Sequence, residues 1–169
     1  MRSFADEKKM KTFRLLLSSP VPLREIVFGK FLACMIVVTV MVLISSYSVG
    51  FLFLLGSTEI GPIVTGYLGV ILMAGCYVSV GVFASSLSDN QIVAAVLTFG
   101  FSLFMWVIGW GAQAAGATTG QVLQFLSIVD HMDRFLKGMV DTSDLVYYLS
   151  FILLSLFLCH RVLDSNRWR

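Results

Sequence analysis

Four long apolar windows constrain the fold of this chain more than any other feature. A helix needs roughly 20 apolar residues to cross a hydrocarbon layer about 30 Å thick. The windows run from Phe31 to Leu55, from Ile63 to Leu87, from Ile92 to Gly111 and from Leu145 to Leu163. The first three lack charged residues, and the fourth contains Arg161 near its end, where a long side chain can reach the headgroups.

These windows predict an all-α integral membrane protein with four transmembrane helices. Of the 169 residues, 57% are apolar and 13% are charged, which is more apolar surface than a water-soluble core can absorb. Unpaired backbone groups are costly in lipid, so each window must be a helix or a strand of a closed barrel. No window shows the alternation of barrel strands. We therefore expect a single membrane domain over residues 1–169.

The distribution of Lys and Arg predicts the sidedness of this domain. Four spans place both termini on the same side of the membrane. Residues 1–30 contain seven basic residues and residues 161–169 contain three, whereas the opposite side has only Arg134 and Lys137. We therefore expect residues 1–30 and the tail 164–169 to be cytoplasmic and residues 112–144 to lie outside.

The charged opening segment predicts an amphipathic interfacial helix from about Ser3 to Leu17. Its apolar residues fall broadly together on a helical wheel, and Ser18, Ser19 and Pro20 end it. One interpretation is an anchor on the membrane surface that pairs basic side chains with anionic membrane lipid. The other is a docking helix for a cytoplasmic partner. Charge content alone does not separate the two.

The connections between the spans contain turn and cap signals. The Ser85 to Gln91 stretch predicts a turn that caps a helix starting near residue 90 or 91. Asp141 or Ser143 can cap the last span, and Tyr147 and Tyr148 follow as an expected aromatic belt.

Residues 112–144 are too apolar for an exposed loop. Helical spacing recurs from Val122 to Val129 and from Met132 to Met139, where Gly138 weakens the second helix. Non-helical backbone at membrane depth must be covered by protein or water. We expect short re-entrant or interfacial helices on the outer face before the last span.

The sequence signals for a catalytic or metal site are weak. Asp130, His131 and Asp133 are more typical of a solvated helix face than of a metal site. The three cysteines fall within spans, at no redox or zinc spacing, and we interpret them as small apolar fillers. Gly29 and Lys30 lack the upstream glycine of a phosphate-binding loop. The sequence predicts no enzyme activity, no metal and no cofactor.

Glycines in the second span predict a close helix contact. Gly66, Gly69, Gly75 and Gly81 can let two helix backbones approach each other, and the same residues are also simply common in membrane helices. Dimerisation across this face is a hypothesis.

Three stretches resemble permeases of type-2 ABC transporters. Residues 4–33 read FADEKKMKTFRLLLSSPVPLREIVFGKFLA, and they are similar to the segment before the third membrane helix of that family. Residues 81–99 read GVFASSLSDNQIVAAVLTF and resemble the region between its fourth and fifth helices. Residues 131–169 resemble the ending of the gliding-motility branch.

The resemblance implies a permease subunit, an exporter in the bacterial inner membrane, that works with a separate cytoplasmic ABC ATPase as a homodimer or with a sister permease. ATP would be hydrolysed on the ATPase subunit. In that family the helix before the third span sits in a cleft of the ATPase. The implied ATPase-coupling residues are Glu7, Lys8, Lys11, Thr12, Arg14 and Leu16, with Asp89 as a second-rank contact.

The chain departs from the family pattern in two ways. Lys11 stands where the family often has Gly, and Arg14 stands where it often has an acidic residue. Nothing in the chain resembles the first two of the family's usual six spans, so we expect a fragment, a mis-set start codon or a shortened subunit. The alternative function is a truncated, non-transporting membrane scaffold that anchors a cytoplasmic partner.

Overall fold

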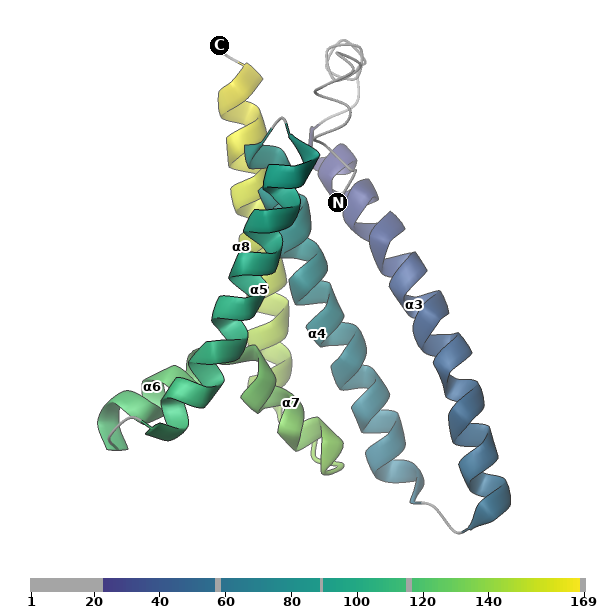
Figure 1. Cartoon of the computed structure of the whole chain (residues 1–169). Coiled ribbons are helices and arrows are strands. Elements are labelled where there is room, and N and C mark those ends of the chain that lie inside the picture. The colour runs from purple at the N-terminus through teal and green to yellow at the C-terminus, as the bar shows by residue number, and fades with distance from the viewer. Residues whose placement is uncertain (1–22, 57–58, 89, 115–116, 168–169) are drawn as a thin grey trace. The chain divides into compact units, whose positions relative to one another are not determined.

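The described part of the chain is helical throughout. The computed structural model describes residues 23–56, 59–88, 90–114 and 117–167. Its helices (Figure 1) are α3 (Leu23–Leu55), α4 (Ile60–Leu87), α5 (Gln91–Ala114), α6 (Ala117–Leu126), α7 (Ile128–Leu136) and α8 (Thr142–Arg167). These residues contain no strand, which confirms the all-α prediction.

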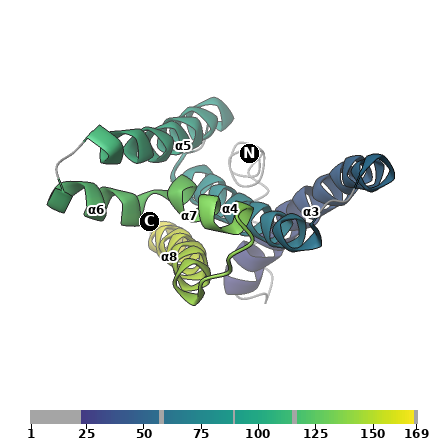
Figure 2. The ribbon, with the colours of Figure 1, turned by 90° about the horizontal axis from the view of Figure 1, so that it is seen from below.

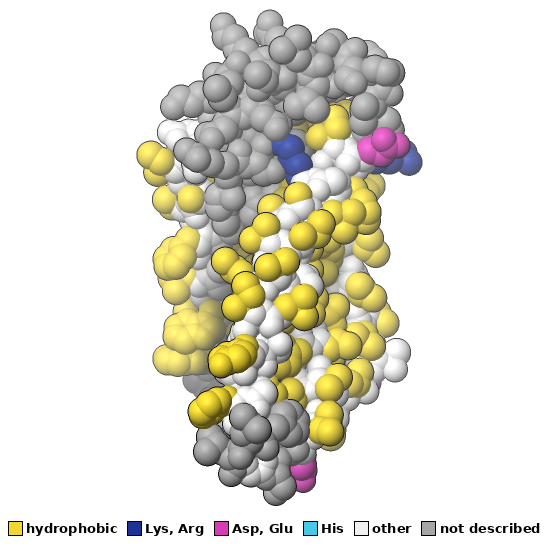
Figure 3. Space-filling view, turned by 90° about the vertical axis from the view of Figure 1, so that its right-hand side faces the viewer, with side chains coloured by type: hydrophobic (Ala, Val, Ile, Leu, Met, Phe, Trp, Pro, Cys, Tyr) yellow, Lys and Arg dark blue, Asp and Glu magenta, His cyan; other side chains and the backbone are white. Residues whose placement is uncertain are grey.

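Four helices are long and apolar enough to cross a membrane. The candidate spans are Leu23–Phe51, Ile60–Leu87, Gln91–Gly111 and Thr142–Ser165, with mean hydropathies of 2.6, 2.0, 2.2 and 1.8. Exposed apolar side chains such as Ile36, Met41 and Ile44 cover α3, and Figure 3 shows such side chains along the face toward the viewer. The four predicted spans are therefore confirmed as apolar helices, and the chain is a multi-pass membrane protein.

The first span begins earlier than the charge-free window. α3 starts at Leu23, eight residues before Phe31, and continues through the charged residues Arg24, Glu25 and Lys30. Leu23, Val27 and Phe31 are buried at a spacing of four residues, which places them on one face of the helix. Packing of that face extends the helix beyond the window.

Two compact units make up the chain. The first unit comprises Met1–Cys34, Gly75–Ser102 and Ser150–Arg169, of which residues 1–22, 89, 168 and 169 are outside the described residues. The second comprises Met35–Ala74 and Leu103–Leu149.

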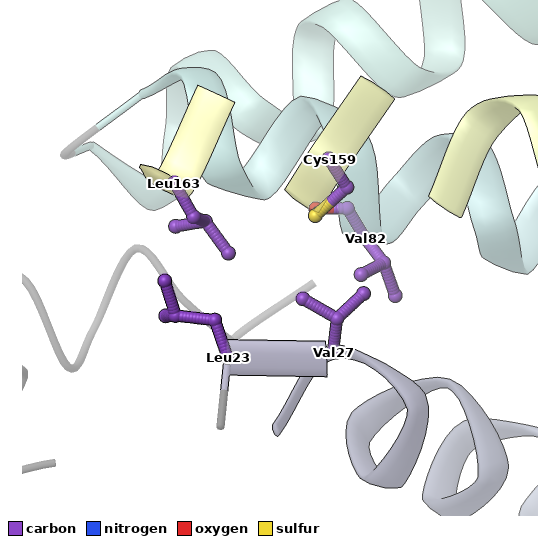
Figure 4. Close-up of a cluster of buried hydrophobic side chains, with 5 residues drawn as sticks. All are labelled: Leu23, Val27, Val82, Cys159 and Leu163. Carbon is purple, nitrogen blue, oxygen red and sulfur yellow. The ribbon is translucent and has the colours of Figure 1, made fainter. Parts of the chain in front are cut away.

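The core of the first unit joins α3, α4 and α8. Leu23 and Val27 of α3 point toward Val82 of α4 and toward Cys159 and Leu163 of α8 (Figure 4). The Cys159 thiol donates a weak hydrogen bond to the Val82 carbonyl, with a distance of 3.8 Å. The fully buried Cys159 is thus a small core residue, as predicted, and the same holds for the buried Cys76.

In the second unit, α7 lies beside the first half of α4 (Figures 1 and 2). A Cβ atom added to Gly69 would lie 2.8 Å from both Met132 Sδ and Phe135 Cβ, so only glycine permits this approach. The Thr65 hydroxyl donates a hydrogen bond of 2.7 Å to the Phe135 carbonyl. Gly69 therefore packs against α7 of its own chain.

Ser127 separates α6 from α7. The predicted helical spacing from Val122 to Val129 is interrupted here, since α6 ends at Leu126 and α7 begins at Ile128. The Ser127 hydroxyl accepts a hydrogen bond of 3.3 Å from the Asp130 amide, which caps the new helix.

The predicted caps agree with the hydrogen bonds. Asn90 Oδ1 accepts a hydrogen bond of 3.0 Å from the Ile92 amide at the start of α5. Asp141 Oδ1 accepts one of 3.1 Å from the Ser143 amide at the start of α8, so the cap is Asp141. Gly138 has a φ of 80° and follows the end of α7, where it allows a left-handed turn.

Candidate functional site

The predicted ATPase-coupling residues lie outside the described residues. This holds for Glu7, Lys8, Lys11, Thr12, Arg14 and Leu16, and for Asp89 in the turn before α5. The predicted amphipathic helix from Ser3 to Leu17 lies outside them as well. Their roles stay predictions.

A buried polar cluster joins α7 to the first turn of α8 in the second unit. Asp144 is fully buried, and only 3% of His131 is exposed. Arg134 Nη2 lies 3.0 Å from Asp144 Oδ1 and 3.3 Å from His131 Nδ1, so one guanidinium nitrogen contacts both groups. Its Nη1 lies 3.4 Å from Asp141 Oδ2. Arg134 therefore links the two helices electrostatically.

The pattern of α7 explains why these groups meet. Ile128, His131, Met132 and Phe135 are its buried residues, at the three- and four-residue spacing of one helical face. Asp133 lies on the exposed face. The prediction of a solvated helix face thus holds for Asp133 and is wrong for His131, because the ring shares the buried face with apolar residues.

Asp144 lies in the first turn of α8, where backbone amides favour a negative charge. No local pattern in the sequence singles out Asp144 as a partner of Arg134, a basic residue on the predicted outer side. Their pairing requires α7 and α8 to pack, and no local spacing signals it.

Tyr147 and Tyr148 connect α8 to the junction between α6 and α7. The Tyr147 hydroxyl donates a hydrogen bond of 2.7 Å to the Leu126 carbonyl, and the Tyr148 hydroxyl donates one of 2.7 Å to the Ile128 carbonyl. Tyr148 is fully buried, so its expected place in an aromatic belt is wrong. The junction has backbone carbonyls that need donors, and the two tyrosines supply them.

The surroundings of His131 lower the pKa of its ring. Burial is the largest cause and lowers the pKa; Asp144 raises it, Arg134 lowers it, and Asp130 and a hydrogen bond to the backbone of Phe125 raise it. His131 Nδ1 lies 3.3 Å from Arg134 Nη2 and 3.4 Å from Asp144 Oδ1, so the ring lies between the cation and the carboxylate. The Tyr147 ring stands edge-on to the imidazole, with centroids 4.2 Å apart.

Acidification should weaken the packing of α7. Because the pKa of His131 is lower in the folded state than in the unfolded state, the unfolded state binds the proton more readily, and stability falls as the pH drops below about 6.5. The protection factors of the α7 amides, which are the exchange rates corrected for the intrinsic rate at each pH, should therefore be lower at pH 5.5 than at pH 7.5. His131→Gln should remove most of this difference, and protection factors that are higher at the lower pH would contradict the assignment.

A pocket of about 440 Å³ opens beside this cluster. Its lining residues are mostly polar and come from α6, α7 and the turn that follows: Gln121, Gln124, Phe125, Asp130, His131, Asp133, Arg134 and Lys137. No group of three His, Cys, Asp or Glu side chains among the described residues is arranged to hold a metal ion. The cluster therefore positions α7 and offers hydrogen-bonding groups.

A comparison with protein families identifies one match over almost the whole chain. The model described as "ABC-2 family transporter protein" matches residues 1–163. This range includes the first three candidate spans and nearly all of the fourth. No curated protein and no solved structure matches the chain.

Proposed function

The chain belongs to the ABC-2 family of transporter proteins, and on this premise we propose that it is the transmembrane permease subunit of an ATP-driven ABC transporter. The observation that carries this proposal is the family match over residues 1–163, which coincides with four apolar helices. Membership in this family implies a cytoplasmic ATPase as a partner in general. The chain itself would contribute the membrane path.

The coupling helix belongs to this proposal. The segment from Glu7 to Leu16 would dock into the ATPase, and nucleotide-driven closure of the ATPase would move the helices that follow. The continuity of α3 from Leu23 into the membrane supports this role, because a rigid helix transmits a displacement of its first turn to the whole span. Asp89, in the turn between α4 and α5, would be a secondary contact.

Sidedness, direction and assembly are further parts of the proposal. The ten-to-two distribution of basic residues supports cytoplasmic termini in a bacterial inner membrane. An exporter of the gliding-motility branch, built as a homodimer or with a sister permease, is supported by the sequence of residues 131–169. The dimer proposal does not rest on Gly69, since α7 of the same chain occupies that surface.

Nucleotide-sensitive association with an ATPase tests the proposed function. The full chain would be co-expressed with ABC ATPases of the same cell, purified, and washed with and without a non-hydrolysable ATP analogue. We expect a nucleotide-dependent complex, and Arg14→Glu should lower its affinity about tenfold, because it reverses a charge at the docking surface.

Lys137→Glu is the matched control. It reverses one basic charge at an exposed position on the predicted outer side and should leave the affinity unchanged. If the chain bound the ATPase equally well with and without the ATP analogue, this result would contradict the permease proposal and favour the membrane scaffold.

A further inference from the structure

A groove in the first unit separates the start of α3 from the end of α8. It has a volume of about 640 Å³. The lining residues that define its character are Arg24 and Phe28 of α3 and Leu156, Phe157, Arg161 and Asp164 of α8. Its walls are therefore apolar side chains with charged groups among them.

Charged and apolar groups follow the same order on both helices. Arg24 and Phe28 are four residues apart in the first turns of α3, and Phe157 and Arg161 are four residues apart in the last turns of α8. Each pair lies on one helical face. Because α3 begins at this groove and α8 ends there, both arginines lie toward the helix ends and both phenylalanines toward the interiors of the spans. The groove thus changes from charged to apolar with depth.

The groove lies near one end of both candidate spans. The first candidate span begins at Leu23, and the last one ends at Ser165. Arg24 and Arg161 therefore lie in the terminal turns of these spans. Long basic side chains near the end of a span can reach the level at which lipid phosphates meet the acyl chains.

The two helices are held in place by the core beside the groove. Leu23 and Val27 of α3 pack against Cys159 and Leu163 of α8 (Figure 4). On α3 the two core residues each come one residue before a groove residue, and on α8 they each come two residues after one. Phe28 and Phe157 remain 54% exposed despite this packing. The apolar wall therefore has a packed core beside it and is accessible.

Both arginines can bind an anion through their guanidinium groups. Among the ion pairs of the described residues, none includes Arg24 or Arg161. The Arg161 guanidinium lies 5.3 Å from the centroid of the Phe157 ring, a contact that orients the cation and leaves N–H groups for another acceptor. With Asp164 also in the wall, the charged end of the groove has a net positive charge.

We propose that this groove binds one anionic phospholipid. Its phosphate contacts Arg24 and Arg161, and an acyl chain lies against Phe28, Leu156 and Phe157. Guanidinium groups bind phosphate through directed hydrogen bonds, and the apolar wall excludes a small hydrophilic anion as the preferred occupant. The proposal depends on the membrane placement of α3 and α8 and is independent of the coupling to an ATPase.

Fluorescence quenching by brominated lipids tests the proposal. A parent variant of the full chain would carry Trp106→Phe, Trp110→Phe and Trp168→Phe, with Phe28→Trp as the reporter in the groove. It would be placed in phosphatidylcholine vesicles and titrated with acyl-brominated phosphatidylglycerol or acyl-brominated phosphatidylcholine. We expect phosphatidylglycerol to quench at a several-fold lower mole fraction.

Variants of the groove should shift this preference in opposite directions. Arg24→Gln and Arg161→Gln should each lower the preference for phosphatidylglycerol about twofold, and the double variant should abolish it, because each arginine attracts the phosphate. Asp164→Asn should increase it, because a carboxylate repels the phosphate. Inorganic phosphate in the buffer should leave the quenching unchanged, whereas displacement by it would identify a site for a free anion and overturn the lipid assignment.

Lys137→Gln is the matched control, because it removes one basic charge at an exposed position of the second unit and should keep the preference. Equal quenching by the two lipids in the parent, or an equal loss in Lys137→Gln, would overturn the proposal. Quenching by the neutral lipid should be the same in every variant, which checks the fold. Native mass spectrometry of the unsubstituted chain, with retained phosphatidylglycerol counted directly, decides the question if the reporter variant fails to fold.

Discussion

Asp144→Ala should destabilise the second unit by about 2 kcal/mol. Removing one partner of a buried pair typically costs 3–5 kcal/mol, but the Arg134 side chain is 41% exposed and can turn to solvent, which reduces the penalty. The loss arises because Arg134 and His131 keep their place on α7 without the carboxylate that holds them to α8. Unfolding in mixed detergent micelles, monitored by circular dichroism, measures this difference.

Asp133→Ala is the matched control for this change. Asp133 has the same charge and lies on the exposed face of α7, so its removal should change stability by no more than about 0.5 kcal/mol. A double-mutant cycle with Arg134→Gln and Asp144→Asn isolates the pair, and we expect a coupling energy of about 1 kcal/mol or more. If both aspartate variants were equally stable, the cluster would have no role in joining α7 to α8.

Gly69→Ala should separate α7 from α4 and destabilise the second unit by about 1–3 kcal/mol. The new Cβ would lie 2.8 Å from Phe135 Cβ, an atom next to the backbone that cannot move without α7. Met132 Sδ, also at 2.8 Å, belongs to a flexible side chain and can shift. Displacement of α7 would also break the hydrogen bond between Thr65 and the Phe135 carbonyl, so faster hydrogen exchange in α7 should accompany the loss.

Gly100→Ala separates this steric effect from the ordinary preference of helices for alanine. No atom lies within 4 Å of a Cβ built on Gly100, and alanine is better than glycine in a helix by about 1 kcal/mol. Gly100→Ala should therefore be neutral or stabilising, whereas Gly69→Ala should have the opposite sign. The same sign in both variants would show that α7 does not pack on α4 as described.

The break between α6 and α7 and the early start of α3 were not predicted, although each has a signal in the nearby sequence. Ser127 is followed three residues later by Asp130, a spacing typical of a helix start, and this signal locates the break between α6 and α7. The early start of α3 also has a local signal, the four-residue spacing of Leu23, Val27 and Phe31. A charge-free window marks the apolar layer of a span, whereas the turns beyond that layer can contain charged residues and still be helical.

The four apolar helices and the cap at Asn90 could be predicted from the sequence, because each depends on residues within a few positions of one another. The sequence left the last cap open between Asp141 and Ser143, and the hydrogen bond to the Ser143 amide assigns it to Asp141. The burial of His131, Asp144 and Tyr148, and the groove that Arg24 and Arg161 share, became visible only once the helices were packed. Hydropathy and capping act along one helix, whereas burial and charge pairing are set by which faces of different helices meet.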